Sequence, residues 1–195
     1  MRYVCPLYKQ GVFIVFSCTK NFNIKTTYGI QRIVFISAII TIIVFLISFE
    51  IFISLVSNRF TDKNFLLFLF SLLAIYPVHK IIHLLAFIGD TRSLVIQKIT
   101  RKSWPPLLNI RVNHPVSKLH FTIALLLPFT LITAAAVTAA VMMPQYGHYL
   151  LFIGSVNAGI SFIDFIYLKY IIKTPRGTFI EERRYGLELL IKCNG

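Results

Sequence analysis

Four long runs of apolar residues, separated by shorter polar segments, dominate the pattern of the chain. Each run has roughly 20 residues or more, which is the length that an α-helix needs to cross the hydrocarbon core of a bilayer. The runs cover residues 33–56, 64–88, 119–143 and 148–172. The pattern therefore predicts an all-α membrane domain of four transmembrane helices, between an N-terminal segment at 1–32 and a tail at 173–195.

The composition agrees with a membrane protein. Hydrophobic residues make up 56% of the chain and charged residues only 14%, whereas a typical soluble domain is about one quarter charged. The net charge is +13, and the lysines and arginines cluster in the N-terminal segment, in the loop at 89–118 and in the tail. By the positive-inside rule, both termini and this loop are expected in the cytoplasm, in a multi-pass protein.

The basic charge points to a lipid partner. No DNA- or RNA-binding motif accompanies it, and its positions alternate with the apolar runs. We therefore expect these charges to face the anionic inner leaflet of the lipid bilayer, and we expect no nucleic-acid partner.

The cytoplasmic loop at 89–118 carries two β-prone stretches, Ser93–Ile99 and Leu107–Val112. Trp104, Pro105 and Pro106 lie between them, and the two prolines favour a turn. We expect a small β-hairpin-like element at the inner surface of the membrane. The alternative is an irregular loop that lies on the lipid headgroups.

Two histidines and a lysine interrupt the second apolar run. His79 and His83 are four residues apart, so their imidazoles share one face of a helix. Polar side chains inside a membrane helix usually have a partner or a function, because lipid offers them no hydrogen bonds. The pattern HKxxH differs by one residue from HExxH, the zinc-binding helix of metalloproteases, and Lys80 stands where that motif has its catalytic glutamate.

A carboxylate in the fourth run matches this pair in depth. Asp164 follows Asn157 and Ser161 on one helical stripe, at spacings of seven and three residues. The second and fourth runs cross in the same direction, and His79 and Asp164 each lie about fifteen residues, or roughly 23 Å, from the outer boundary. His79, His83 and Asp164 are therefore predicted to form a zinc site with three protein ligands and an open fourth position. Asn157 and Ser161 are expected to support these ligands.

Three interpretations of Lys80 stay open. Its ammonium group could pair with Asp164 at the same depth, or its aliphatic stem could carry it to the inner headgroups. As a neutral amine beside a cation it could also replace the missing base. Glu50 lies near the outer boundary, so it is a poor partner for Lys80.

Several of these features together resemble a known family. They are the segment Thr27–Arg32 before the first run, the His79/His83 helix, the β-prone loop and the stripe that ends at Asp164. From about residue 18 to residue 192 the chain resembles the bacterial zincin-peptidase membrane family, a domain of unknown function. That family is similar to the site-2 protease class of intramembrane metalloproteases. The resemblance implies zinc on both histidines and Asp164, a general base in the position of Lys80, and a place in the bacterial cell membrane.

The sequence leads to three hypotheses about function. The first is a metalloprotease-like membrane protein without ordinary peptidase activity, a pseudoenzyme that binds or regulates a membrane protein or peptide. The second is an active zinc-dependent intramembrane peptidase with an altered base. The third is a small transporter or channel subunit that uses the intramembrane polar residues as a relay.

Overall fold

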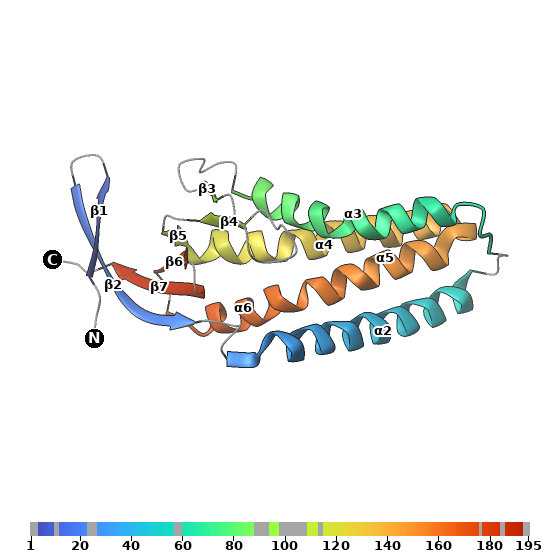
Figure 1. The fold of residues 1–195 in the computed structure, drawn as a ribbon, viewed down its shortest axis with the longest axis horizontal. Coiled ribbons are helices and arrows are strands. Elements are labelled where there is room, and N and C mark those ends of the chain that lie inside the picture. The colour runs from blue at the N-terminus through green and yellow to red at the C-terminus, as the bar shows by residue number, and fades with distance from the viewer. Residues whose placement is uncertain are drawn as a thin grey trace. The chain divides into compact units, whose positions relative to one another are not determined.

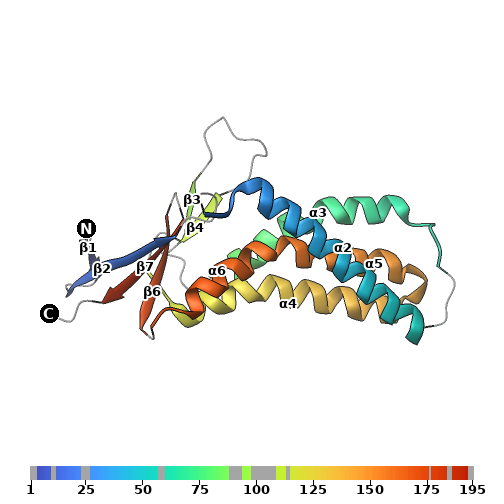
Figure 2. The ribbon, with the colours of Figure 1, turned by 90° about the horizontal axis from the view of Figure 1, so that it is seen from below.

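The computed structural model describes most of the chain, as two compact units (Figures 1 and 2). The described residues are 4–9, 12–22, 27–56, 60–87, 94–97, 109–112, 115–175, 177–183 and 186–192. One unit, here the helical unit, consists of Tyr28–Leu85 and Leu125–Lys169. The other, here the sheet unit, consists of Met1–Thr27, Ala86–Ala124 and Tyr170–Gly195.

Long helices coincide with the four predicted apolar runs. They are α2 (Ile30–Leu55), α3 (Phe65–Leu85), α4 (Lys118–Met142), and α5 (Gly147–Ile160) followed by α6 (Phe162–Ile172), with the short helix η2 (Pro144–Tyr146) before α5. Three of them, α2, α3 and α4, are each long and apolar enough to cross a membrane. The segments Pro144–Ile160 and Phe162–Ile172 are bent by 43° at a break and give a fourth crossing if they count as one.

The surface of these helices is unusually apolar. Val34 of α2, Leu66 and Leu73 of α3 and Leu119 of α4 are all more than half exposed. Only 6% of the most apolar window of α2 is buried, and 11% of that of α3. An exposed apolar surface of this extent is costly in water and suits a hydrocarbon environment.

Small residues bring α2 and α5 into close contact. A Cβ atom added to Gly159 would meet the Thr41 hydroxyl and would lie 2.7 Å from the Ser37 carbonyl oxygen. A Cβ atom added to Gly147 would collide with the ring of Phe52. Close approach of backbones over small residues is the usual way in which apolar helices associate when lipid surrounds them.

The sheet unit corrects the predicted all-α class. It contains a five-stranded antiparallel sheet in the order β1-β2-β7-β6-β5. The strands are β1 (Val4–Lys9), β2 (Val12–Phe22), β5 (Val116–Ser117), β6 (Thr178–Arg183) and β7 (Gly186–Lys192). Because β2 near the N-terminus pairs with β7 near the C-terminus, no local pattern in the sequence reveals the partner of either strand.

The predicted hairpin-like element in the long loop is confirmed. Strand β3 (Leu94–Gln97) pairs with β4 (Asn109–Val112) in antiparallel register, with Leu94 opposite Val112. The turn expected at Trp104 lies outside the described residues.

Candidate metal centre

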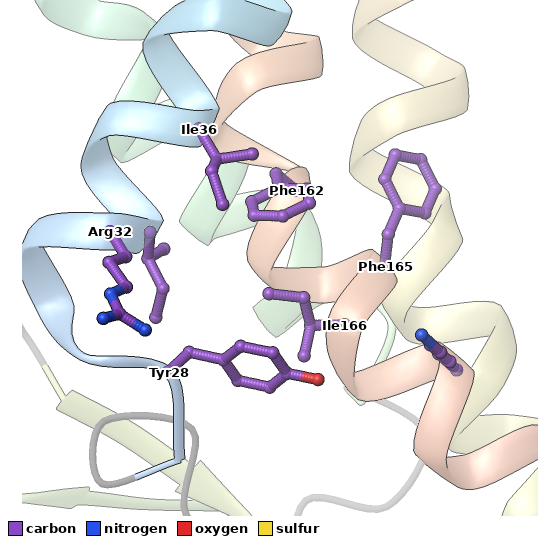
Figure 3. A pocket seen from close by; sticks show the side chains of 8 residues that line it. Tyr28, Arg32, Ile36, Phe162, Phe165 and Ile166 are labelled. Carbon is purple, nitrogen blue, oxygen red and sulfur yellow. The ribbon is translucent and has the colours of Figure 1, made fainter.

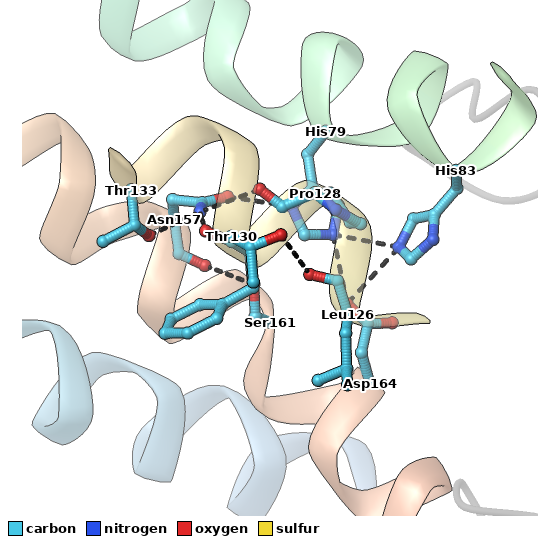
Figure 4. A network of polar contacts seen from close by, with 10 residues as sticks. His79, His83, Leu126, Pro128, Thr130, Thr133, Asn157, Ser161 and Asp164 are labelled. Atoms are coloured by element: carbon cyan, nitrogen blue, oxygen red, sulfur yellow. Dashed lines mark hydrogen bonds and ion pairs between the residues drawn. The ribbon is translucent and has the colours of Figure 1, made fainter. Parts of the chain in front are cut away.

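Three helices of the helical unit supply the polar residues of the candidate site. His79 and His83 lie one turn apart on α3, Asn157 lies on α5, and Asp164 lies in the first turn of α6. Ser161 occupies the break between α5 and α6 and caps α5. The structure thus brings together the two histidines and the aspartate that the sequence analysis singled out (Figure 4).

The three side chains converge on a small, buried space. The Nε2 atom of His79 lies 3.1 Å from Oδ2 of Asp164 and 3.1 Å from Nε2 of His83. The Nε2 atom of His83 lies 3.4 Å from the same carboxylate oxygen. His79 is 1% exposed and Asp164 is 8% exposed, so solvent barely reaches the centre. The fold therefore holds two imidazole nitrogens and a carboxylate oxygen in mutual contact at a nearly dry position.

Hydrogen bonds on the far side of Asn157 fix the orientation of its amide. Its Nδ2 group donates to the Thr133 hydroxyl at 3.2 Å and faces the carbonyl oxygens of Pro128 and Phe129, each at 3.4 Å. Carbonyl oxygens can only accept hydrogen bonds, so the amide nitrogen must be on this side. The amide oxygen, Oδ1, is consequently the atom that lies 2.9 Å from Nδ1 of His79.

This orientation determines the tautomer of His79. Because Oδ1 of Asn157 can only accept, Nδ1 of His79 carries the proton and donates it. In the neutral imidazole the other nitrogen, Nε2, then has its lone pair directed at Asp164 and His83. A hydrogen bond that fixes one ring nitrogen while the other is offered as a ligand is the usual support of a metal-binding histidine.

The convergence of acceptors calls for a cation or for extra protons. The Nε2 lone pair of a neutral His79 and an ionised Asp164 oxygen repel each other at 3.1 Å unless something positive lies between them. A metal ion is one solution. A proton between the two atoms, held by Nε2 of His79 or by the Asp164 carboxyl group, is the alternative.

The spacing of the three atoms fits zinc. Zinc lies about 2.0–2.1 Å from nitrogen and oxygen ligands, and tetrahedral angles then separate two ligand atoms by roughly 3.3–3.4 Å. The observed separations are 3.1, 3.1 and 3.4 Å. Two imidazoles and one carboxylate are also a donor set that catalytic zinc sites use, with the fourth position left open. These residues therefore fit the ion that the sequence predicts.

Ser161 supports the site through the backbone of α5. Its described hydrogen bonds do not reach the candidate ligand atoms. Its hydroxyl donates to the Asn157 carbonyl oxygen at 2.8 Å, and its main-chain nitrogen donates to the same oxygen at 2.9 Å. These bonds close the last turn of α5 just before the chain bends into α6. The bend lies between Asn157 and Asp164, so the geometry at Ser161 sets how these two side chains approach α3.

Lys80 is not part of the cluster. The lysine side chain is exposed while that of His79 is buried. In the described part of the chain, the ion pairs of Asp164 run to the two histidines. The interpretation in which Lys80 pairs with Asp164, one of the three left open, therefore does not match the structure, because the lysine side chain is exposed and the carboxylate contacts the two histidines.

The residues that hold Asn157 in place were not predicted from the sequence. Thr133 and the carbonyl groups at Pro128 and Phe129, all on α4, orient its amide. Two signals were available in the sequence. One is a hydroxyl inside an apolar run, and the other is a proline in the same helix, which removes a main-chain donor and disturbs the regular bonding around it.

Fold and site together define a class: an apolar helical protein with a candidate centre of two histidines and one aspartate. Comparison with protein families agrees with this class. The chain belongs to the family whose model is described as "Putative zincin peptidase", which matches residues 72–179, more than half of the chain. That range includes both histidines, Asn157, Ser161 and Asp164. No curated protein and no solved structure matches the chain, and the likeness to the site-2 protease class stays a prediction.

Proposed function

We propose that this protein is a multi-pass protein of the bacterial cell membrane that binds zinc at His79, His83 and Asp164. It does not act as an ordinary zinc peptidase. Its function is to bind or regulate a membrane protein or peptide. Both termini and the loop at 89–118 lie in the cytoplasm.

Insertion into a membrane is supported by the helices themselves. Up to four helical segments are long and apolar enough to cross, and the apolar side chains of α2 and α3 are largely exposed. The orientation rests on the lysine and arginine distribution, which places the basic segments on the cytoplasmic side.

Zinc binding is supported by the donor set and its spacing. Asn157 holds Nδ1–H of His79, which leaves Nε2 of that ring for a ligand, and Asp164 supplies a carboxylate oxygen 3.1 Å away. When bound, zinc would supply a Lewis acid and an open position for an oxygen atom, such as a peptide carbonyl. The burial of His79 and Asp164 excludes bulk water from this position.

The proposed lack of peptidase activity rests on one observation: position 80 holds a lysine where the HExxH motif has its glutamate. In the HExxH motif the glutamate takes a proton from the attacking water, a step worth about 10²–10⁴ in rate. Here that position holds a lysine, and its side chain is exposed. Within the described residues, Asp164 is the one carboxylate of the candidate cluster. Its oxygen contacts both histidines, so it does not replace the missing glutamate as a base.

Metal analysis of the purified protein tests the site. The unmodified protein in neutral detergent should hold one zinc ion per chain, and His79→Ala and Asp164→Ala should lose it. His148→Ala is the matched control, because it removes a histidine outside the cluster and should keep the ion. Absence of zinc from the unmodified protein after incubation with the metal would refute the zinc site.

A protease assay tests the remainder of the proposal. Unmodified protein and His79→Ala are compared for cleavage of transmembrane peptides in the presence and absence of a chelator. We expect no difference between them. Cleavage that the chelator stops and His79→Ala abolishes would instead establish the active peptidase with an altered base.

A further inference from the structure

A second feature of the helical unit is a groove between α2 and α6, away from the histidine cluster. It has a volume of about 490 Å³, and its lining includes Tyr28, Arg32, Ile36, Phe162, Ile166 and Lys169 (Figure 3). Neither the candidate metal centre nor the proposed function makes use of these residues.

The groove has a charged end and an apolar end. Arg32 lies in the first turn of α2 and Lys169 in the last turn of α6, and both side chains are exposed. Ile36 lies one turn further along α2, and Phe162 lies at the start of α6, almost two turns before Lys169. Figure 3 shows Arg32 and Tyr28 toward one end of the groove and Ile36 and Phe162 toward the other.

The two cations have no acidic partner in the described part of the chain. Neither Arg32 nor Lys169 takes part in an ion pair with a carboxylate of the described residues, whereas Asp62 and Asp164 pair with histidines. Two exposed cations beside an apolar wall give the groove a positive end that no carboxylate among the described residues pairs with. An occupant that complements the groove must therefore carry a negative charge at one end and hydrocarbon at the other.

We propose that this groove binds one anionic phospholipid of the inner leaflet. The phosphate lies between Arg32 and Lys169, and an acyl chain follows Ile36, Ile166 and Phe162 into the membrane. Tyr28 lies at the level of the headgroup, where aromatic residues with a polar end are favoured. The proposal rests on the proposed membrane insertion and orientation, which place this end of α2 and α6 at the cytoplasmic boundary, but it does not depend on zinc.

The chemistry of the groove selects among lipids and anions. A zwitterionic phospholipid has the hydrocarbon but no net charge for the two cations. Inorganic phosphate has the charge but nothing to fill the apolar wall. An anionic phospholipid such as phosphatidylglycerol satisfies both parts of the groove, so it should bind more tightly than either.

Native mass spectrometry of the full chain in neutral detergent tests this. The protein is titrated with phosphatidylglycerol, with phosphatidylcholine and with inorganic phosphate, and bound molecules are counted. The test variant is Arg32→Gln with Lys169→Gln. The matched control is Lys63→Gln with Lys173→Gln, which removes two exposed lysines that do not line the groove.

We expect the unmodified protein and the control to retain one phosphatidylglycerol, and the test variant to bind it about 30-fold more weakly. This magnitude follows from the usual contribution of one lysine or arginine beside an anionic headgroup, taken twice. Equal binding by the test variant and the control, equal binding of phosphatidylcholine, or equally tight binding of inorganic phosphate would each overturn the proposal. The zinc content of the test variant is measured in parallel and should be unchanged, so that failure of the lipid site is distinguishable from failure of the zinc site.

Discussion

Asn157 offers the sharpest test of how the candidate centre is built. Its side chain is fully buried. The amide oxygen accepts a hydrogen bond from His79, and the amide nitrogen donates one to Thr133. Substitution Asn157→Leu keeps a side chain of similar size and removes the acceptor of the His79 Nδ1–H group. The imidazole then loses the bond that fixes both its rotation and its tautomer.

The distances indicate that loss of the hydrogen bond to His79 matters more than loss of the contacts with the α4 carbonyl groups. The bond between His79 and Asn157 is 2.9 Å long, whereas the contacts of the amide nitrogen with the carbonyl groups of Pro128 and Phe129 are 3.4 Å and therefore weak. Removing a hydrogen-bond partner of a metal-binding histidine typically weakens the metal by about 10–100-fold, or roughly 1.4–2.8 kcal/mol. A buried donor without a partner costs a further amount of about 1–3 kcal/mol in folding free energy.

The assay is a competition titration of zinc between the purified protein and a chromophoric chelator. Asn157→Leu should bind zinc about 10–100-fold more weakly than the unmodified protein. Thr133→Val is the matched control, because it removes one partner of the same amide and leaves the bond to His79 in place. Its zinc affinity should change by less than about threefold.

A third variant separates orientation from packing. Asn157→Asp keeps an acceptor for His79 but places carboxylate oxygens against the carbonyl groups at Pro128 and Phe129. It should keep zinc affinity while its melting temperature falls. Unchanged zinc binding by a folded Asn157→Leu protein would refute the reasoning, because His79 would then not depend on this bond.

Three other predictions concern the base position, the helix packing and the topology. Lys80→Glu reverses an exposed charge next to His79 in the chain, from one that repels a cation to one that attracts it, so zinc affinity in the chelator titration should rise only slightly, by less than about threefold, and a fall would contradict the proposed site. Gly159→Ala places a methyl group against Thr41, where α5 contacts α2. It should lower the free energy of unfolding, measured by heat or denaturant, by about 1–3 kcal/mol. An unchanged melting temperature would show that α2 can move away from α5 at no cost. A reporter fused after Lys63 should lie outside the cytoplasm and one fused after Lys102 inside it, and the reverse result would invert the orientation.

Local features of the sequence predicted the helices and the three residues of the candidate cluster. Length and hydropathy are local properties, so the apolar runs predicted the helices closely. The four-residue spacing predicted that His79 and His83 share one face of a helix, and the predicted convergence of Asp164 with them agrees with the structure. The hairpin of β3 and β4 also followed from local composition, because its two strands lie close together in the chain.

Other features depended on contacts between distant parts of the chain. The pairing of β2 with β7 joins the two ends of the sequence, and neither strand has a local pattern that names its partner. Whether Lys80 meets Asp164 depends on how α3 is rotated in the bundle, and the structure leaves the lysine side chain exposed. The role of Asn157 depends on α4, which brings Thr133 to the far side of its amide. Periodicity indicates which residues share a face of one helix, whereas packing decides what that face meets. For this reason only the tertiary structure identified Thr133 as a partner of Asn157 and showed Lys80 to lie outside the cluster.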